Sequence, residues 1–291
     1  MTKQYEFILI KHCICEWGFS FRPDYRALNY WRLTHPKIPI LALTATATHQ
    51  VREDIKKTLG LNGLEVTVPP HRSNLYYEVR LKDQDNDPFK DIYSLLQGIY
   101  KLRSKRIAKN EGKSPIERVQ GVCAIIYCLK KDTCDEVARL LREKNINAAS
   151  YHAGITPPQR RKILKDWTDT DEYTIDPKNM VDVVVATISF GMGIDKKNVR
   201  LLIHWDVSSS FESYYQESGR AGRDNKTSRC ILYYSRKDGV RAAFFATPKE
   251  SGSKEGNPHS EMKMKSMSQV EWHLIDSFCS IVRMIRYVAM L

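Results

Sequence analysis

Apolar runs of strand length alternate with helical stretches between residues 122 and 234, and this alternation limits the possible folds more than any other feature. The expected strands are Val122–Tyr127, Ala148–Tyr151, Val181–Ala186, Val199–Trp205 and Cys230–Tyr234, and the expected helices are Asp132–Glu143 and Pro157–Trp167. Such alternation is typical of parallel strands joined by right-handed helical crossovers, with ligands at the carboxyl ends of the strands. The sequence therefore predicts the α/β fold class and a nearly complete parallel-sheet domain.

Residues 1–66 predict part of a further α/β domain. Tyr5–Ile10 and Ile38–Leu43 have strand length, and Thr48–Leu59 carries apolar residues at helical spacing before Gly60. Residues 67–88 are mixed and polar and include a Pro-Pro pair, so they are interpreted as a connector. Residues 89–248 then form the main domain, and residues 249–291 a polar loop followed by an apolar, helical stretch.

The charge balance favours a polyanionic partner. Lys and Arg number 46 against 34 Asp and Glu, which gives a net charge of +12. This excess of positive charge is compatible with a nucleic acid as the partner and equally with an acidic membrane face. No apolar run approaches the ~18 residues of a membrane span, and the first residues lack a secretory signal. The seven cysteines form no Cys-x-x-Cys pair, so we expect a soluble, reduced, intracellular protein.

The segment Tyr214–Asp224 reads Tyr-Tyr-Gln-Glu-Ser-Gly-Arg-Ala-Gly-Arg-Asp and is expected on a helix that opens after Phe211. It places Arg220 and Arg223 three residues apart, each after a small residue. A guanidinium stays protonated and offers a planar fork of donors, which suits the charge that builds up on a phosphoryl group in transfer. The alternative is an ordinary solvated basic helix face, which an isolated Arg-x-x-Arg would favour.

The segment Val183–Asp195 is a valine-rich strand that runs into a glycine-bearing loop and ends in a carboxylate. A strand before a Gly-x-Gly loop is common in any α/β protein. The longer string Ala186–Asp195, with Val199-Arg200 and His204-Trp205-Asp206 after it, is more specific. Together with Gln216–Asp224 it resembles the last two motifs of superfamily 2 helicases, and the RecQ DNA helicases in particular. The resemblance implies RecA-like helicase domains, the first partial and the second nearly complete.

The resemblance assigns roles to individual residues. It makes Arg223 the arginine finger, Arg220 its partner and Gln216 a contact that relays nucleotide state. It places Thr187 and Ser189 on the nucleic-acid backbone, where hydroxyl and N–H groups contact phosphate. The positions expected near the nucleotide are Gly193, Asp195 and His12.

The amino-terminal part carries two further elements. Trp17, Phe19 and Phe21 surround Arg22 in a pattern that by itself indicates a half-buried strand, but that resembles the aromatic-rich loop of RecQ helicases. In that loop, exposed rings and an arginine bind single-stranded DNA by stacking. Thr44 and Thr46 resemble the third helicase motif, which links the nucleotide and nucleic-acid sites. The alternative for these threonines is a helix N-cap.

The sequence departs from the family at the nucleotide site. No Gly-x-x-x-x-Gly-Lys-Ser/Thr phosphate loop occurs, and Leu9-Ile10-Lys11-His12 stands where Asp-Glu-Ala-His is expected. A lysine cannot hold Mg²⁺, so only His12 remains of that motif. Beyond Ser268, Cys279 is the only thiol, so we expect no zinc in this chain. The pattern indicates a chain truncated at both ends.

By resemblance, the function is that of an ATP-dependent 3′–5′ DNA helicase that uses ATP and Mg²⁺ in recombination and repair, in the nucleus on chromosomes. Its expected partners are single-stranded or branched DNA and recombination or replication proteins, with no membrane. The alternative is a catalytically inactive DNA-binding or partner-binding module. An RNA helicase of the same superfamily fits the motifs less well. His152 is expected to be structural, and the basic cluster Lys101 to Lys109 to be a solvated loop.

Overall fold

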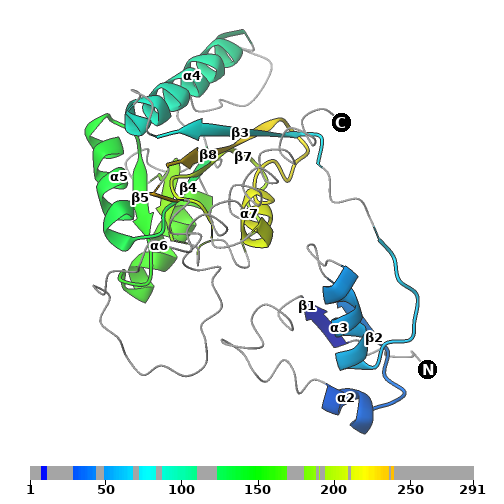
Figure 1. Ribbon diagram of the computed structural model, residues 1–291. Coiled ribbons are helices and arrows are strands. Elements are labelled where there is room, and N and C mark those ends of the chain that lie inside the picture. The colour runs from blue at the N-terminus through cyan, green and yellow to red at the C-terminus, as the bar shows by residue number, and fades with distance from the viewer. Residues whose placement is uncertain are drawn as a thin grey trace, which may run out of the picture. The chain divides into compact units, whose positions relative to one another are not determined.

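Figure 1 shows the computed structural model, which describes residues 8–11, 29–43, 49–67, 72–82, 87–109, 123–168, 180–187, 190, 194–208, 211–235 and 237–238. The chain divides into two compact units, Met1–His71 and Arg72–Leu291.

The first unit contains a parallel strand pair and two helices. Its elements are β1 (Ile8–Lys11), α2 (Asn29–Thr34), β2 (Ile40–Leu43) and α3 (His49–Leu59). Gly60 ends α3 with a φ of 60°, a conformation that glycine adopts without a steric penalty. The N–H of Leu61 then donates to the carbonyl of Lys56 at 2.9 Å, which closes the last turn. The expected strands and helix are therefore present, with shifted bounds.

The second unit is built on a six-stranded sheet in which every paired strand is parallel. The strand order is β3-β8-β7-β4-β6-β5. The strands are β3 (Leu75–Leu81), β4 (Cys123–Tyr127), β5 (Ala148–Tyr151), β6 (Val183–Ala186), β7 (Val199–His204) and β8 (Ser228–Tyr234). The helices are α4 (Pro88–Lys109), α5 (Lys131–Glu143), α6 (Pro157–Thr168) and α7 (Phe211–Ser218). This architecture confirms the predicted α/β class.

Each face of this sheet carries its own hydrophobic core. Alternate residues of a strand point to opposite faces, so Ala124 and Ile126 of β4 join the core beneath α4 and α5, while Ile125 and Tyr127 join the other. The second core also contains Trp167 of α6. Because the central strands are buried on both faces, they appear in the sequence as continuous apolar runs.

The predicted connector over residues 67–88 was too long. The structure places the boundary between the units after His71, and Leu75–Leu81 forms the edge strand β3. β3 was missed because it mixes polar and apolar residues, as an edge strand with one partner can. Its partner β8 follows more than 150 residues later, with Leu75 opposite Ser228.

The basic cluster that begins at Lys101 was also assigned wrongly. The chain remains helical to Lys109, as the second half of α4, rather than forming a loop. Ile92 and Leu96 of this helix are buried against the sheet, whereas Lys101 and Lys105 are exposed. The stretches 249–268 and 270–291 lie outside the described residues.

Candidate functional site

The two arginines of the finger segment lie on a series of turns that follows α7. We call residues 219–224 the arginine turn. The N–H of Gly219 donates to the carbonyl of Tyr215 at 2.9 Å, and that of Ala221 to the carbonyl of Ser218 at 3.0 Å. Gly222 then turns the chain with a φ of +55°. The segment was expected on a helix that opens after Phe211, but the helix ends at Ser218, before both arginines.

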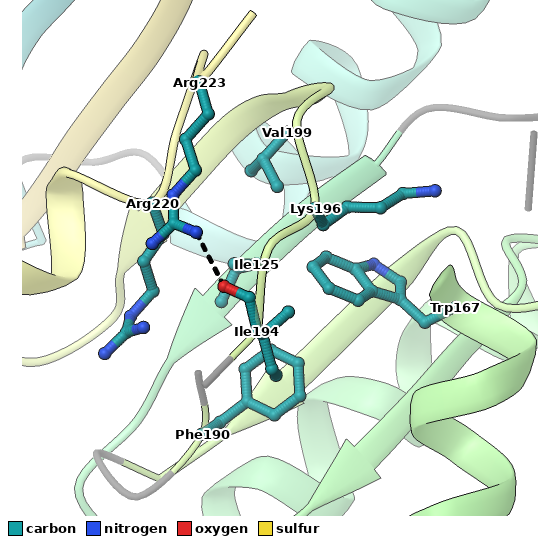
Figure 2. Close-up of a pocket in the computed structure, with 8 residues that line it drawn as sticks. All are labelled: Ile125, Trp167, Phe190, Ile194, Lys196, Val199, Arg220 and Arg223. Carbon is teal, nitrogen blue, oxygen red and sulfur yellow. Dashed lines mark hydrogen bonds between the residues drawn. The ribbon is translucent and has the colours of Figure 1, made fainter. Parts of the chain in front are cut away.

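Arg223 reaches back to the residues that precede β7. Its Nη1 donates to the carbonyl of Ile194 at 2.7 Å, drawn as a dashed line in Figure 2, and to Oδ1 of Asp195 at 2.9 Å. The side chain of Asp195 is 72% exposed and that of Arg223 is 33% exposed. Exposed ion pairs contribute only about 0–1 kcal/mol, so Arg223 can exchange Asp195 for another anion at low cost.

Both arginines line one small pocket beside β4 and β7 (Figure 2). The lining residues are Ile125, Trp167, Phe190, Ile194, Lys196, Val199, Arg220 and Arg223. Its empty volume is about 200 Å³, including the part open to solvent.

Tyr127 is the last residue of β4 and interacts with Arg220. Its hydroxyl donates to the carbonyl of Phe190 at 3.0 Å. Burial raises the pKa of the Tyr127 hydroxyl well above its usual value, while the nearby positive charge of Arg220 opposes that rise. Arg220 and Phe190 also line the same pocket.

A buried polar pair fixes α7 to the sheet. Oε2 of Glu217 accepts from Nε2 of His204 at 2.8 Å and from the hydroxyl of Ser208 at 2.8 Å. Both His204 and Glu217 are almost completely buried. The His204 ring stacks on Tyr127, with ring centroids 5.4 Å apart. Because Glu217 directly precedes Ser218 at the end of α7, this pair determines where the arginine turn begins.

Two further guanidinium groups hold the backbone of the arginine turn. Arg72, the first residue of the second unit, donates to three carbonyls, those of Gly219, Ala221 and Gly222. Arg200 of β7 forms an ion pair with Asp224. Burial acts to raise the pKa of the Asp224 carboxyl, but the hydrogen bond and charge of Arg200 outweigh it and lower the pKa.

The structure places some of the predicted site residues and leaves others outside the described part. Arg220, Arg223 and Asp195 lie together, Gln216 is half-buried in the last turn of α7, and Thr187 follows β6. The N–H of Thr187 donates to the carbonyl of Tyr151 at 3.3 Å. The predicted residues outside the described part are His12, Trp17, Phe19, Phe21, Arg22, Thr44, Thr46, Ser189 and Gly193.

Sequence reasoning missed Arg72, Asn74 and the His204–Glu217 pair. Arg72 and the carbonyls that it binds are 147 to 150 residues apart, so no local pattern connects them. The only local signal is a short polar stretch before the apolar Leu75. By contrast, His152 is buried and bonds the Asp135 carboxylate at 3.1 Å, a contact of the structural kind expected for it.

Within the described residues, no cluster of three His, Cys, Asp or Glu side chains could hold a metal ion. β1 is also apolar up to Ile10 and ends at Lys11, at the place where the sequence resemblance expects acidic residues. Among the helices that the structure describes, none is long and apolar enough to cross a membrane.

Comparisons with known proteins agree on a helicase module. The family model for the helicase conserved C-terminal domain matches residues 108–225. The chain is 40% identical over 235 residues to ATP-dependent DNA helicase Q5 of Rattus norvegicus, covering 80% of this chain and 22% of that protein. It is 41% identical over 225 residues to ATP-dependent DNA helicase Q1 of the same species, covering 77% and 32%. The chain thus spans less than a third of the length of these relatives.

The fold is similar to that of two solved structures of one other protein. Saccharomyces cerevisiae Dbp5 bound to RNA and ADP BeF3 matches with a TM-score of 0.54 and 14% identity, covering 97% of this chain and 63% of that chain. Its L327V variant, also bound to RNA and ADP BeF3, matches with a TM-score of 0.56 and 13% identity, covering 97% and 63%. At this identity the likeness shows the fold alone, and it confirms the expectation of a parallel-sheet, RecA-like architecture.

Proposed function

Because the chain belongs, by sequence similarity over most of its length, to the RecQ family of helicases, we propose that it supplies the arginine-bearing half of an ATP-dependent 3′–5′ DNA helicase. One observation carries the proposal: Arg220 and Arg223 line the same small pocket, on a turn whose backbone is held at several points. Such a helicase acts in recombination and repair, which implies a nuclear, chromosomal location.

Arg223 is proposed to stabilise the charge on the phosphoryl group during ATP hydrolysis. A guanidinium that is already positioned costs little reorganisation when that charge develops, and an arginine finger contributes about 10³–10⁵-fold to kcat. The exposed pair with Asp195 supports this role, because a weak partner releases Arg223 readily. Arg220 lies closer to Tyr127 and is proposed to assist from within the pocket.

The described residues fit the guanidinium part of this chemistry but not the part that holds Mg²⁺. β1 ends in Ile10 and Lys11, and the described part offers no cluster of carboxylates. This favours a second candidate function for the chain by itself: a module that binds DNA or helicase partners without hydrolysing ATP.

Two proteins separate these functions. The first is the 291-residue chain as it stands. The second, which we call the extended protein, adds an amino-terminal region that contains a Gly-x-x-x-x-Gly-Lys-Ser/Thr phosphate loop, and it carries Leu9→Asp and Ile10→Glu. Both are assayed for DNA-stimulated ATP hydrolysis and for unwinding of duplexes with a 3′ or a 5′ single-stranded tail.

We expect no hydrolysis above buffer from the chain as it stands, and ATP-dependent unwinding of the 3′-tailed duplex from the extended protein. An extended protein that binds DNA without hydrolysing ATP would support the inactive module instead. Turnover on the order of 1 per second by the unextended chain would contradict the division of roles, because kinetics at that level require a complete phosphoryl-transfer site.

A further inference from the structure

The guanidinium of Arg72 lies at the centre of the arginine turn. Its Nη1 donates to the carbonyls of Gly219 and Ala221, each at 3.0 Å, and its Nη2 donates to the carbonyl of Gly222. Three of the six carbonyls in the turn therefore accept from one side chain. The contacts are half-buried, so water competes with them less than at an open surface.

The chemistry of this contact suits arginine and no other residue. The last carbonyls of a helix have no partner within the helix and favour a nearby positive charge, and the carbonyls of the arginine turn follow the end of α7 directly. A guanidinium presents several N–H donors in one rigid plane, whereas a lysine presents three donors from a single atom. Only arginine can bond three carbonyls spread over four residues in this geometry.

Asn74, two residues after Arg72, adds further hydrogen bonds to the same part of the chain. Its Nδ2 donates to the carbonyl of Gly222 at 2.8 Å and to that of Lys226 at 3.0 Å. Its own carbonyl accepts from the N–H of Ser228 at 2.9 Å, where β8 begins. Arg72 and Asn74 thus fix the two ends of the chain between α7 and β8, which is the part that carries both finger candidates.

Arg72 and Asn74 stand at the boundary between the two units of the chain. Arg72 is the first residue of the second unit, and the residues before it lead from the first unit. The side chains that hold the turn backbone therefore belong to Arg72 and Asn74, among the first residues of the second unit.

We propose that Arg72 is a positioning residue of the arginine turn, which sets the backbone that presents Arg220 and Arg223. The inference rests on the proposed function, because it names what positions the finger. Arg72 acts through the turn and is not itself assigned a contact with the phosphoryl group.

The test replaces Arg72 and compares the turn with the rest of the sheet in the full chain. The variants are Arg72→Lys, Asn74→Ala and a matched control, Arg229→Lys. Arg229 lies in β8 of the same sheet, and its side chain bonds Glu78 of β3 at 2.6 Å. Backbone amide exchange is measured for residues 219–222 and for the strands β4 and β7. The Nε–Hε resonance of Arg223, assigned with Arg223→Lys, reports on the finger side chain.

In Arg72→Lys we expect amide exchange in the turn to become roughly tenfold faster and the Arg223 resonance to move, while β4 and β7 exchange within about twofold of the original rate. Asn74→Ala should act in the same direction by about threefold, and it decides the test if Arg72→Lys does not fold. Arg229→Lys should leave the turn and the Arg223 resonance unchanged.

Two results would overturn the proposal: a turn and an Arg223 resonance that do not respond, or protection lost equally in the turn and in the strands, which would make Arg72 a general stability residue. Neither readout requires ATP or DNA. Loss of unwinding in the extended protein would therefore remove the proposed function alone, and an unresponsive turn in an active helicase would remove only the role of Arg72.

Discussion

Gly222 lies so close to Asn74 that a Cβ at position 222 would come 2.6 Å from Nδ2 of the asparagine. The same Cβ would come 2.8 Å from the carbonyl of Lys226 and 2.8 Å from the hydroxyl of Ser228. The φ of +55° is also a conformation that side chains disfavour. Glycine at this position is therefore required by both backbone conformation and space.

Gly222→Ala should lower the free energy of unfolding by about 2–4 kcal/mol, because the strained φ and the backbone contact both oppose the new methyl group. Urea unfolding followed by circular dichroism measures the change. Gly98→Ala is the matched control, since Gly98 lies within α4 and a Cβ there meets nothing within 4 Å. That variant should gain about 0.5–1 kcal/mol. Equal effects of the two substitutions would refute this account of Gly222.

The predictable part of the fold is the part with continuous apolar runs. β4 and β6 are buried along their whole length, and their sequences contain almost nothing but apolar residues. β3 could not be recognised, because Glu78 and Arg80 interrupt its apolar pattern and its partner β8 lies far along the chain. A strand that depends on a distant partner carries little local signal.

The residues of the candidate site likewise divide into those that the sequence predicts and those that it does not. Motif resemblance brought together Arg220, Arg223 and Asp195, because those positions carry a distinctive string of residue types. Their supports, Arg72 and His204, could not be found in this way, since each acts through a tertiary contact that the local sequence does not show. The end of α7 was also misplaced, because the glycines that end the helix fall inside the motif itself.

Removing one partner of the buried His204–Glu217 pair should be costly. His204→Phe keeps the ring beside Tyr127 and Tyr214 but leaves the Glu217 carboxylate without its nitrogen donor. We expect a loss of about 3 kcal/mol in the free energy of unfolding. The double variant His204→Phe/Glu217→Met should recover most of it, since no charge then remains buried. A double variant no more stable than the single one would contradict this interpretation of the pair.

The carboxylate of Asp91 should make stability depend on pH in a known direction. It accepts from Tyr233 at 2.6 Å and from Arg80 at 2.5 Å. Burial acts to raise the pKa of Asp91, but these hydrogen bonds and the charge of Arg80 outweigh it and lower the pKa. The stabilisation is therefore present above the unfolded pKa of about 3.9 and is lost as the pH falls through the lower folded pKa.

Asp91→Asn removes this carboxylate at every pH. The original chain should be the more stable of the two at pH 7, and the difference should narrow as the pH falls below about 4. Urea unfolding of both proteins at pH 7 and at pH 3 measures it. A difference that stays constant between the two pH values would show that Asp91 does not titrate with folding.

The net charge of +12 and the predicted aromatic loop should produce sequence-independent binding to single-stranded DNA. Affinity should fall steeply between low and physiological salt, because bound phosphates release counterions. Trp17→Ala should weaken binding by about 1–3 kcal/mol if a base stacks on the ring. Fluorescence anisotropy with unrelated oligonucleotides measures both effects. Tyr76→Ala, at an exposed aromatic of β3, is the control and should change nothing. An unaltered affinity in Trp17→Ala would place Trp17 in the protein core instead.

Arg223 is proposed to act on transition-state charge, and the kcat of DNA-stimulated ATP hydrolysis by the extended protein measures this role. Arg223→Ala should lower kcat by about 10³-fold or more with DNA affinity nearly unchanged, while the control Arg229→Lys should keep kcat. Arg223→Lys should recover little, because a point charge replaces a planar fork poorly. If Arg223→Lys instead keeps most of the activity, Arg223 is a surface cation, and the role of the finger belongs to Arg220.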